Sequence, residues 1–154
     1  MQCADRGNDD AQAWDADSGD GTIYQYNYSH NNGGGCVMFC LNQSYRNTFR
    51  YNISQGDLKG MMDITNNRDA HVYNNVFIIP EGQPFIRMAN RQGQGNMLVE
   101  NNIIYYEGAS PRAEMWQKNA AKQHYSNNLY YNYTGAPAED TAEFSLVSDL
   151  AGFF

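Results

Sequence analysis

Asparagine recurs at a nearly constant spacing along the chain, each time between apolar or aromatic residues. The residues that set this register, called the anchors below, are Asn27, Asn52, Asn75, Asn102 and Asn128. Successive anchors are 25, 23, 27 and 26 residues apart. The residue after each anchor is apolar or aromatic: Tyr28, Ile53, Val76, Ile103 and Leu129. The residue three places before it is also apolar or aromatic: Tyr24, Phe49, Val72, Val99 and Tyr125. The pattern predicts two inward-facing apolar columns and one polar column.

A second segment repeats in step with the anchors. It occupies residues 36–42, 61–67, 85–91 and 113–119. These segments align on Phe39, Ile64, Met88 and Met115, with spacings of 25, 24 and 27. Two independent registers that share one period indicate a repeat architecture.

The repeating segments are typical of strands. They alternate with a period of two and are rich in Val, Ile, Tyr and Phe, and they contain Asn and Gly where a helix would be weakened. The leucine framework of a leucine-rich repeat is absent. The sequence therefore predicts an all-β fold, a right-handed parallel β-helix of about five coils stacked about 4.8 Å apart. We expect the coils to span residues 1–132, with 133–154 as an exit loop or a truncated cap.

The β-helix gives the anchors a physical role. At a sharp bend between strands, Asn tolerates the left-handed backbone conformation. Its amide can also donate to and accept from the amides of the coils above and below. We therefore predict a ladder of anchor side chains along the solenoid.

Composition narrows the range of partners. The chain has 154 residues, enough for one domain, and no apolar run long enough to cross a membrane. The formal net charge of −7 argues against binding to nucleic acid. Six of the seventeen acidic residues lie within the first twenty positions, which suggests a cation or a hydroxyl-rich ligand there. Cys3, Cys36 and Cys40 have no metal-type spacing, and we expect three unpaired thiols.

The stretch "DADSGDGTIYQYNYSHNNGGG" (15–35), followed by "NNVF", "NNIIY" and "NNLYY", resembles the right-handed β-helix proteins of the pectate-lyase-like superfamily. The resemblance covers most of residues 14–132. It implies action on a polysaccharide or oligosaccharide, as a glycoside hydrolase or a polysaccharide lyase, in a secreted, extracellular or periplasmic bacterial protein. The same superfamily contains non-catalytic stalks. Gly33-Gly34-Gly35 stands where such sequences more often have an acidic residue.

The first candidate site is the acidic segment 9–21, which we expect to form a long loop. Asp15, Asp17 and Asp20 could bind Ca²⁺ through hard oxygen ligands. Crowded carboxylates could instead raise one pKa and supply a general acid. A solvated acidic loop is the third interpretation.

The second candidate site is an outward column of the second repeating segment, formed by Met38, Asp63, Arg87 and Glu114. An ion-pair ladder is one interpretation, with Asp63 and Glu114 two coils, or roughly 10 Å, apart. A solvated charged face is the other.

The same face could bind a sugar. Arg87, Arg91 and Lys118 could hold a uronate carboxylate, beside Glu114. Trp116 could stack on a sugar ring.

His30 is the third candidate, as a base beside the glycine turn. A structural, hydrogen-bonded histidine is the alternative. His71 and His124 stand at a different offset from their anchors, so a three-histidine metal site is not expected.

The leading prediction is a carbohydrate-active enzyme. A hydrolase would use paired carboxylates drawn from Asp15, Asp17 and Asp63. A lyase would use Arg87 or His30 to take the proton, next to a carboxylate neutralised by Ca²⁺ or arginine. The alternative is a non-catalytic carbohydrate-binding or structural module. Open strand edges at the coil ends also favour homo-oligomers.

Overall fold

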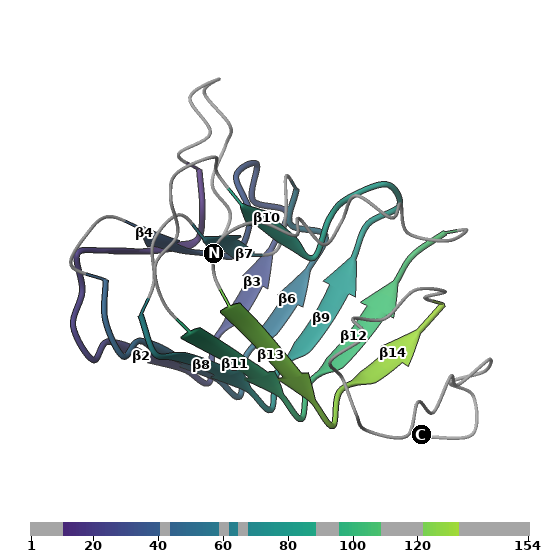
Figure 1. Ribbon diagram of the computed structural model, residues 1–154. Helices are drawn as coiled ribbons and strands as arrows, with labels where there is room; N and C mark the ends of the chain where they lie inside the picture. The colour runs from purple at the N-terminus through teal and green to yellow at the C-terminus, as the bar shows by residue number, and fades with distance from the viewer. Residues whose placement is uncertain are drawn as a thin grey trace.

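The computed structural model describes residues 11–40, 44–58, 62–64, 68–88, 96–108 and 122–132. These residues form an all-β solenoid, in which short strands from successive coils pair in parallel (Figure 1). This confirms the predicted parallel β-helix, while its handedness and number of coils stay predictions. None of the described segments is a helix that is long and apolar enough to span a membrane.

The described strands make three sheets, one along each side of the coil (Figure 1). The first sheet contains β1 (Trp14–Asp17), β4 (Val37–Cys40), β7 (Met62–Ile64) and β10 (Ile86–Met88). The second contains β2 (Ile23–Gln25), β5 (Thr48–Arg50), β8 (Ala70–Tyr73), β11 (Asn96–Glu100) and β13 (Lys122–Ser126). The third contains β3 (Tyr28–His30), β6 (Ile53–Gln55), β9 (Val76–Ile79), β12 (Ile103–Tyr106) and β14 (Leu129–Tyr131).

The register between coils agrees with the sequence repeat. In the first sheet, Phe39 pairs with Ile64, and Ile64 pairs with Met88. In the second sheet, the column three residues before the anchors is also in register: Tyr24, Phe49, Val72, Val99 and Tyr125. Residues some two dozen apart in the chain are therefore direct neighbours. The predicted fourth member of the first column, Met115, lies outside the described residues.

One of the two predicted apolar columns faces outward. The residues after the anchors include Tyr28, Ile53 and Ile103, which are 51%, 45% and 38% exposed. The inward positions come one residue later and are buried: Ser29, Ser54, Phe77, Ile104 and Tyr130. The reason is the anchor itself, whose amide is turned inside the bend. Strand alternation then directs the next side chain outward and the following one inward.

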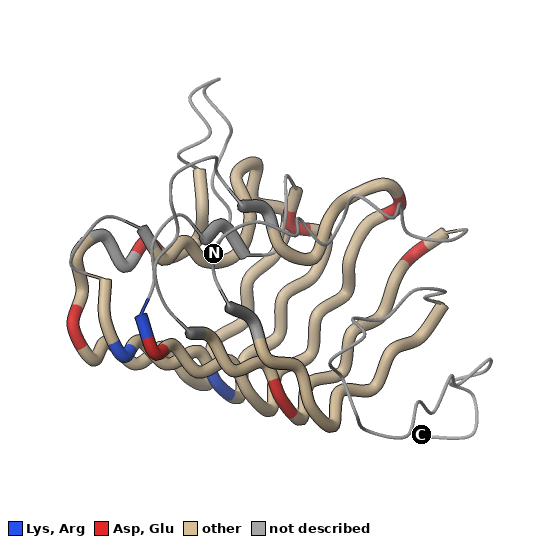
Figure 2. Tube along the Cα trace, viewed as in Figure 1, with Lys and Arg blue, Asp and Glu red and all other residues tan. Residues whose placement is uncertain are grey.

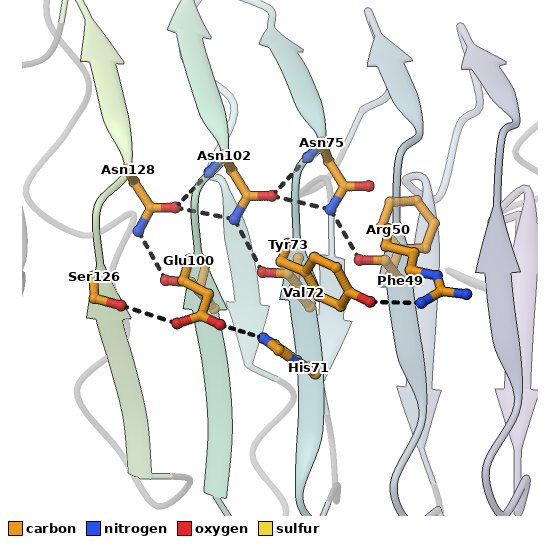
Figure 3. A network of polar contacts seen from close by, with 11 residues as sticks. Phe49, Arg50, His71, Val72, Tyr73, Asn75, Glu100, Asn102, Ser126 and Asn128 are labelled. Carbon is orange, nitrogen blue, oxygen red and sulfur yellow. Dashed lines mark hydrogen bonds and ion pairs between the residues drawn. The ribbon is translucent and has the colours of Figure 1, made fainter.

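The anchor ladder is present, and four of its five side chains are buried: Asn52, Asn75, Asn102 and Asn128 (Figure 3). The side-chain oxygen of Asn102 accepts from both the backbone N–H and the side-chain amide of Asn75, at 3.0 Å each. The side-chain amide of Asn102 also donates to the carbonyl of Val72 at 3.0 Å. Every pair of successive anchors repeats the amide–amide bond. Each rung therefore satisfies buried polar groups from two coils.

The left-handed residue at each bend is the one before the anchor, which corrects the predicted backbone conformation. The residues with positive φ there are Tyr26, Tyr51, Asn74, Asn101 and Asn127, with φ between 53° and 58°. This left-handed residue turns the chain and lets the anchor amide point inward. Turning and hydrogen bonding are thus divided between adjacent residues.

The ladder predicts a large stability difference between adjacent asparagines. Asn75→Ala removes acceptors used by Asn52 and the donor to the carbonyl of Phe49, leaving buried backbone groups unsatisfied. We expect a loss of about 2–4 kcal/mol in the free energy of unfolding, measured by urea titration. Asn101→Gly is the matched control, because Asn101 is exposed and Gly accepts positive φ. Equal losses in the two variants would contradict the role of the ladder.

Between the first coils the interior is polar. The buried carboxylate of Asp57 accepts four hydrogen bonds. Its Oδ1 accepts from the backbone N–H and the side-chain amide of Asn32, at 2.9 and 2.7 Å. Its Oδ2 accepts from the hydroxyls of Ser29 and Ser54, at 2.7 and 2.6 Å. Asn32 and Asp57 therefore reproduce the geometry of an anchor pair.

Cys36 lies in this region as a buried, free thiol. Burial and, to a lesser extent, the charge of Asp57 raise the pKa of Cys36 to about 12. In a variant with Cys3→Ser and Cys40→Ser, we expect Cys36 to resist Ellman's reagent at pH 8. Only about one thiol in ten thousand is then ionised, and the sulfur is shielded. Unfolding in guanidinium should restore full reaction. Rapid labelling of the folded variant would show that the interior is open.

Candidate functional site

The first sheet contains three of the predicted acidic residues, Asp15 and Asp17 on β1 and Asp63 on β7. Trp14 packs against Tyr24 and Phe49 in the core, so strand alternation places its neighbour Asp15 on the outer face. Asp15 pairs in register with Met38, and Met38 pairs with Asp63. One column therefore runs across adjacent coils, as the sequence predicted for Met38 and Asp63. Asp15 joins this column because Trp14–Asp17 forms strand β1, which corrects the predicted long loop over residues 9–21.

Asp15 and Asp17 stand two residues apart on β1, with Cα atoms about 6.7 Å apart. Asp63 lies two strands from Asp15, or roughly 10 Å. Glycosidases use carboxyl pairs about 5–5.5 Å or 6.5–9.5 Å apart. The Cα spacing on β1, about 6.7 Å, lies within the second range, near its lower limit.

Asp15 is exposed and lies close to a tyrosine. The hydroxyl of Tyr24 donates to the backbone carbonyl of Asp15 at 3.2 Å. Burial, and secondly the charge of Asp15, raise the pKa of Tyr24 above its ordinary value. Tyr24 therefore remains a protonated donor at neutral pH. Met38, the next member of the column, is only 8% exposed, so the outer face is covered there.

Asp20 points toward a different partner. Its two carboxylate oxygens accept from Nε and Nη2 of Arg46 at 3.0 and 2.7 Å. Within the described part of the chain, no group of three His, Cys, Asp or Glu side chains could hold a metal ion. The side chain of Asp17 is outside that description, so the predicted Ca²⁺ site of Asp15, Asp17 and Asp20 stays a prediction.

Arg87 pairs in register with Asp63, as predicted for the charged column. The other predicted substrate-binding residues lie outside the described residues: Arg91, Glu114, Trp116 and Lys118. Their proposed contacts with a sugar stay predictions.

His30 belongs to another sheet. It ends β3, where its ring stacks on Tyr28 with centroids 5.2 Å apart, and the side chain of Asn31 lies 3.4 Å from its Nδ1. The acidic residues of β1 and β7 belong to the first sheet. The structure therefore does not place His30 on the same sheet face as the carboxylates.

The glycine run that leads into β4 has a packing role. The backbone N–H of Gly34 donates to the carbonyl of Ala11 at 3.1 Å. A Cβ at Gly34 would lie 2.6–2.9 Å from backbone atoms of Ala11. No side chain fits there, so glycine stands where an acidic residue was expected for a reason of space.

A polar column that was not among the predicted sites lies on the second sheet. Two residues before each anchor come Gln25, Arg50, Tyr73, Glu100 and Ser126, in register across five strands. Arg50 donates to Gln25 and to the hydroxyl of Tyr73, at 2.8 and 2.7 Å. The same period that revealed the anchors would have revealed this column.

An ion pair extends the polar column (Figure 3). His71 Nε2 lies 2.6 Å from one oxygen of Glu100, and the hydroxyl of Ser126 donates to the other at 3.2 Å. Glu100 stands between the other two, so the arrangement lacks the serine–histidine contact that nucleophilic catalysis requires.

Charge is unevenly distributed over the solenoid. The strands of the third sheet carry no charged residue, whereas the second sheet bears both signs (Figure 2). The outward faces thus differ in chemistry. The first sheet exposes Asp15, the second presents a mixed polar row, and the third presents apolar and aromatic side chains.

The chain is similar to Lacto-N-biosidase from Bifidobacterium longum subsp. longum, with 42% identity over 141 residues. The match takes in 89% of this chain but 9% of the relative, so the chain spans less than a tenth of that protein's length. No known family profile matches the chain. The similarity links the chain to a glycoside hydrolase, which agrees with the predicted carbohydrate-active class. Membership of the pectate-lyase-like superfamily and secretion stay predictions.

Proposed function

We propose that this chain forms a section of a glycoside hydrolase that releases lacto-N-biose from an oligosaccharide. The observation that carries this proposal is the 42% identity to Lacto-N-biosidase over 89% of the chain. The parallel solenoid is compatible with it, because its regular coils hold side chains from different coils at fixed spacings along one face. Lyase chemistry is less well supported, since the similarity is to a glycoside hydrolase.

The carboxylates of β1 are the proposed catalytic pair. One, protonated, would donate a proton to the glycosidic oxygen, while the other would act as nucleophile or activate a water. Asp15 and Asp17 are two residues apart on one strand, whereas Met38 lies between Asp15 and Asp63 in the register of the sheet. We therefore assign the pair to Asp15 and Asp17, and assign Asp63 a supporting role at the site.

Substitution of either carboxylate tests the proposal. We expect Asp15→Asn and Asp17→Asn each to lower kcat for a chromogenic lacto-N-bioside at least 100-fold in the full-length protein. Asn preserves size but cannot donate a carboxyl proton or attack as an anion. Asp63→Asn should have a smaller effect.

Asp69→Asn is the matched control, because Asp69 is exposed and has positive φ, which Asn accepts. It should keep full activity. Undiminished activity in both β1 variants would refute the assignment of the pair. Sugar binding by a wild-type protein that hydrolyses nothing would instead identify a non-catalytic carbohydrate-binding module.

We further propose that Ca²⁺ supports the acidic segment through Asp15 and Asp17, with Asp20 recruited if it leaves Arg46. The support is the density of carboxylate oxygens, which are hard ligands suited to this ion. We expect EDTA to lower the Tm by several degrees and added Ca²⁺ to restore it. An unchanged melting curve in EDTA would exclude a structural calcium.

A further inference from the structure

The bend between the second and third sheets contains two tyrosines in an unfavourable backbone conformation. Before each of the five anchors stands a residue with positive φ. Three coils place Asn there (Asn74, Asn101 and Asn127), which tolerates this conformation, but the first two place Tyr26 and Tyr51, with φ of 58° and 54°. For a bulky aromatic residue, a positive φ is conformationally unfavourable. The rings must therefore serve a purpose that asparagine cannot.

The two rings are exposed and stacked. Tyr26 is 74% exposed and Tyr51 is 41% exposed. Their centroids lie 5.3 Å apart with planes 8° from parallel, and Tyr73 meets Tyr51 edge-on at 5.9 Å. One face of Tyr26 is turned to Tyr51, and the high exposure leaves its other face open to solvent. Both rings are held in place by neighbours rather than by burial.

Polar groups flank the rings. The guanidinium of Arg50 lies 5.8 and 5.9 Å from the ring centroids of Tyr51 and Tyr73. Arg50 also donates to the side chain of Gln25, the residue before Tyr26. Hydrogen bonding to Tyr73 is the main cause that raises the pKa of Arg50, so its charge is permanent. Within the described residues, no carboxylate forms an ion pair with Arg50.

We propose that this tyrosine stack, Tyr26 and Tyr51 with Tyr73, Arg50 and Gln25, is a second binding site for a neutral oligosaccharide. Sugar rings combine an apolar C–H face, which packs on an aromatic ring, with hydroxyls that bond to guanidinium and amide groups. The stack offers both kinds of contact. A purely apolar partner would leave the Arg50 charge desolvated, which is costly.

The position of the stack separates it from the proposed catalytic face. It lies at the bend that joins the second and third sheets, across the coil from the first sheet (Figure 1). A glycan held there would tether the protein to its substrate without occupying Asp15 and Asp17. The choice of lacto-N-biose as probe rests on the proposed function, but the binding itself does not require hydrolysis.

The test compares Tyr26→Asn and Tyr51→Asn with wild type in the full-length protein. Affinity electrophoresis in a gel containing a polymer that bears lacto-N-biose measures binding. We expect each variant to bind the polymer at least tenfold more weakly, with unchanged kcat/KM for the small chromogenic lacto-N-bioside. Tyr131→Asn is the matched control, because it removes a ring from another stacked pair, Tyr105 and Tyr131, on the third sheet. It should bind like wild type.

Melting curves distinguish binding from a structural role. Because Asn is the residue that later coils use at this bend, Tyr26→Asn should leave the Tm unchanged or raise it by about 3 °C. Unchanged polymer binding in both variants would overturn the proposal, as would a lower Tm with no loss of binding. If the β1 variants keep hydrolysis while the tyrosine variants lose polymer binding, the proposed catalytic pair fails and the tyrosine site stands. If the β1 variants lose hydrolysis while the tyrosine variants bind the polymer normally, the tyrosine site fails and the catalytic pair stands.

Discussion

The asparagine ladder is the interaction on which the rest of this structure depends. A parallel solenoid must bend its backbone three times per coil and still satisfy the polar groups buried at each bend. Here Asn102, for example, accepts through its side-chain oxygen from the backbone N–H and the side-chain amide of Asn75, and its own amide donates to the carbonyl of Val72 in the same neighbouring coil, all at about 3 Å. Without these bonds, each bend between the second and third sheets would bury unpaired donors and acceptors. The ladder also fixes the register, because a slip of one residue would remove every rung.

The fixed register determines the chemistry of the outer faces. Because the register between coils is fixed, equivalent positions of the repeat form columns, and the columns differ in the chemical type of their side chains. Asp15 is exposed on the first sheet, a mixed polar row lies on the second, and exposed apolar side chains lie on the third. A rigid backbone of this kind can hold two reactive carboxylates at a fixed spacing, which is what glycoside hydrolysis requires.

At each bend, the anchor stabilises the fold while the residue before it is free to vary. The residue before each anchor turns the chain and projects outward, so it can vary without disturbing the ladder behind it. Three coils use asparagine there, which suits the conformation, and two use tyrosine, which does not. Backbone strain of this kind persists only where the surroundings are firmly held, and it concentrates at functional positions. The ladder supplies the firm surroundings that allow Tyr26 and Tyr51 to occupy their positions.

The sequence by itself determined the repeat, the parallel stacking and the ladder, because a fixed period with asparagine at one position has few other physical solutions. It also placed Asp63 and Arg87 in one column, since that follows from register alone. The tertiary structure decided which side of each strand faces inward, because the anchor amide occupies the inside of the bend and reverses the expected alternation after it. It also placed Asp20 against Arg46 and His30 on a different sheet from the carboxylates. Those relations depend on the path of each bend, which periodicity does not encode.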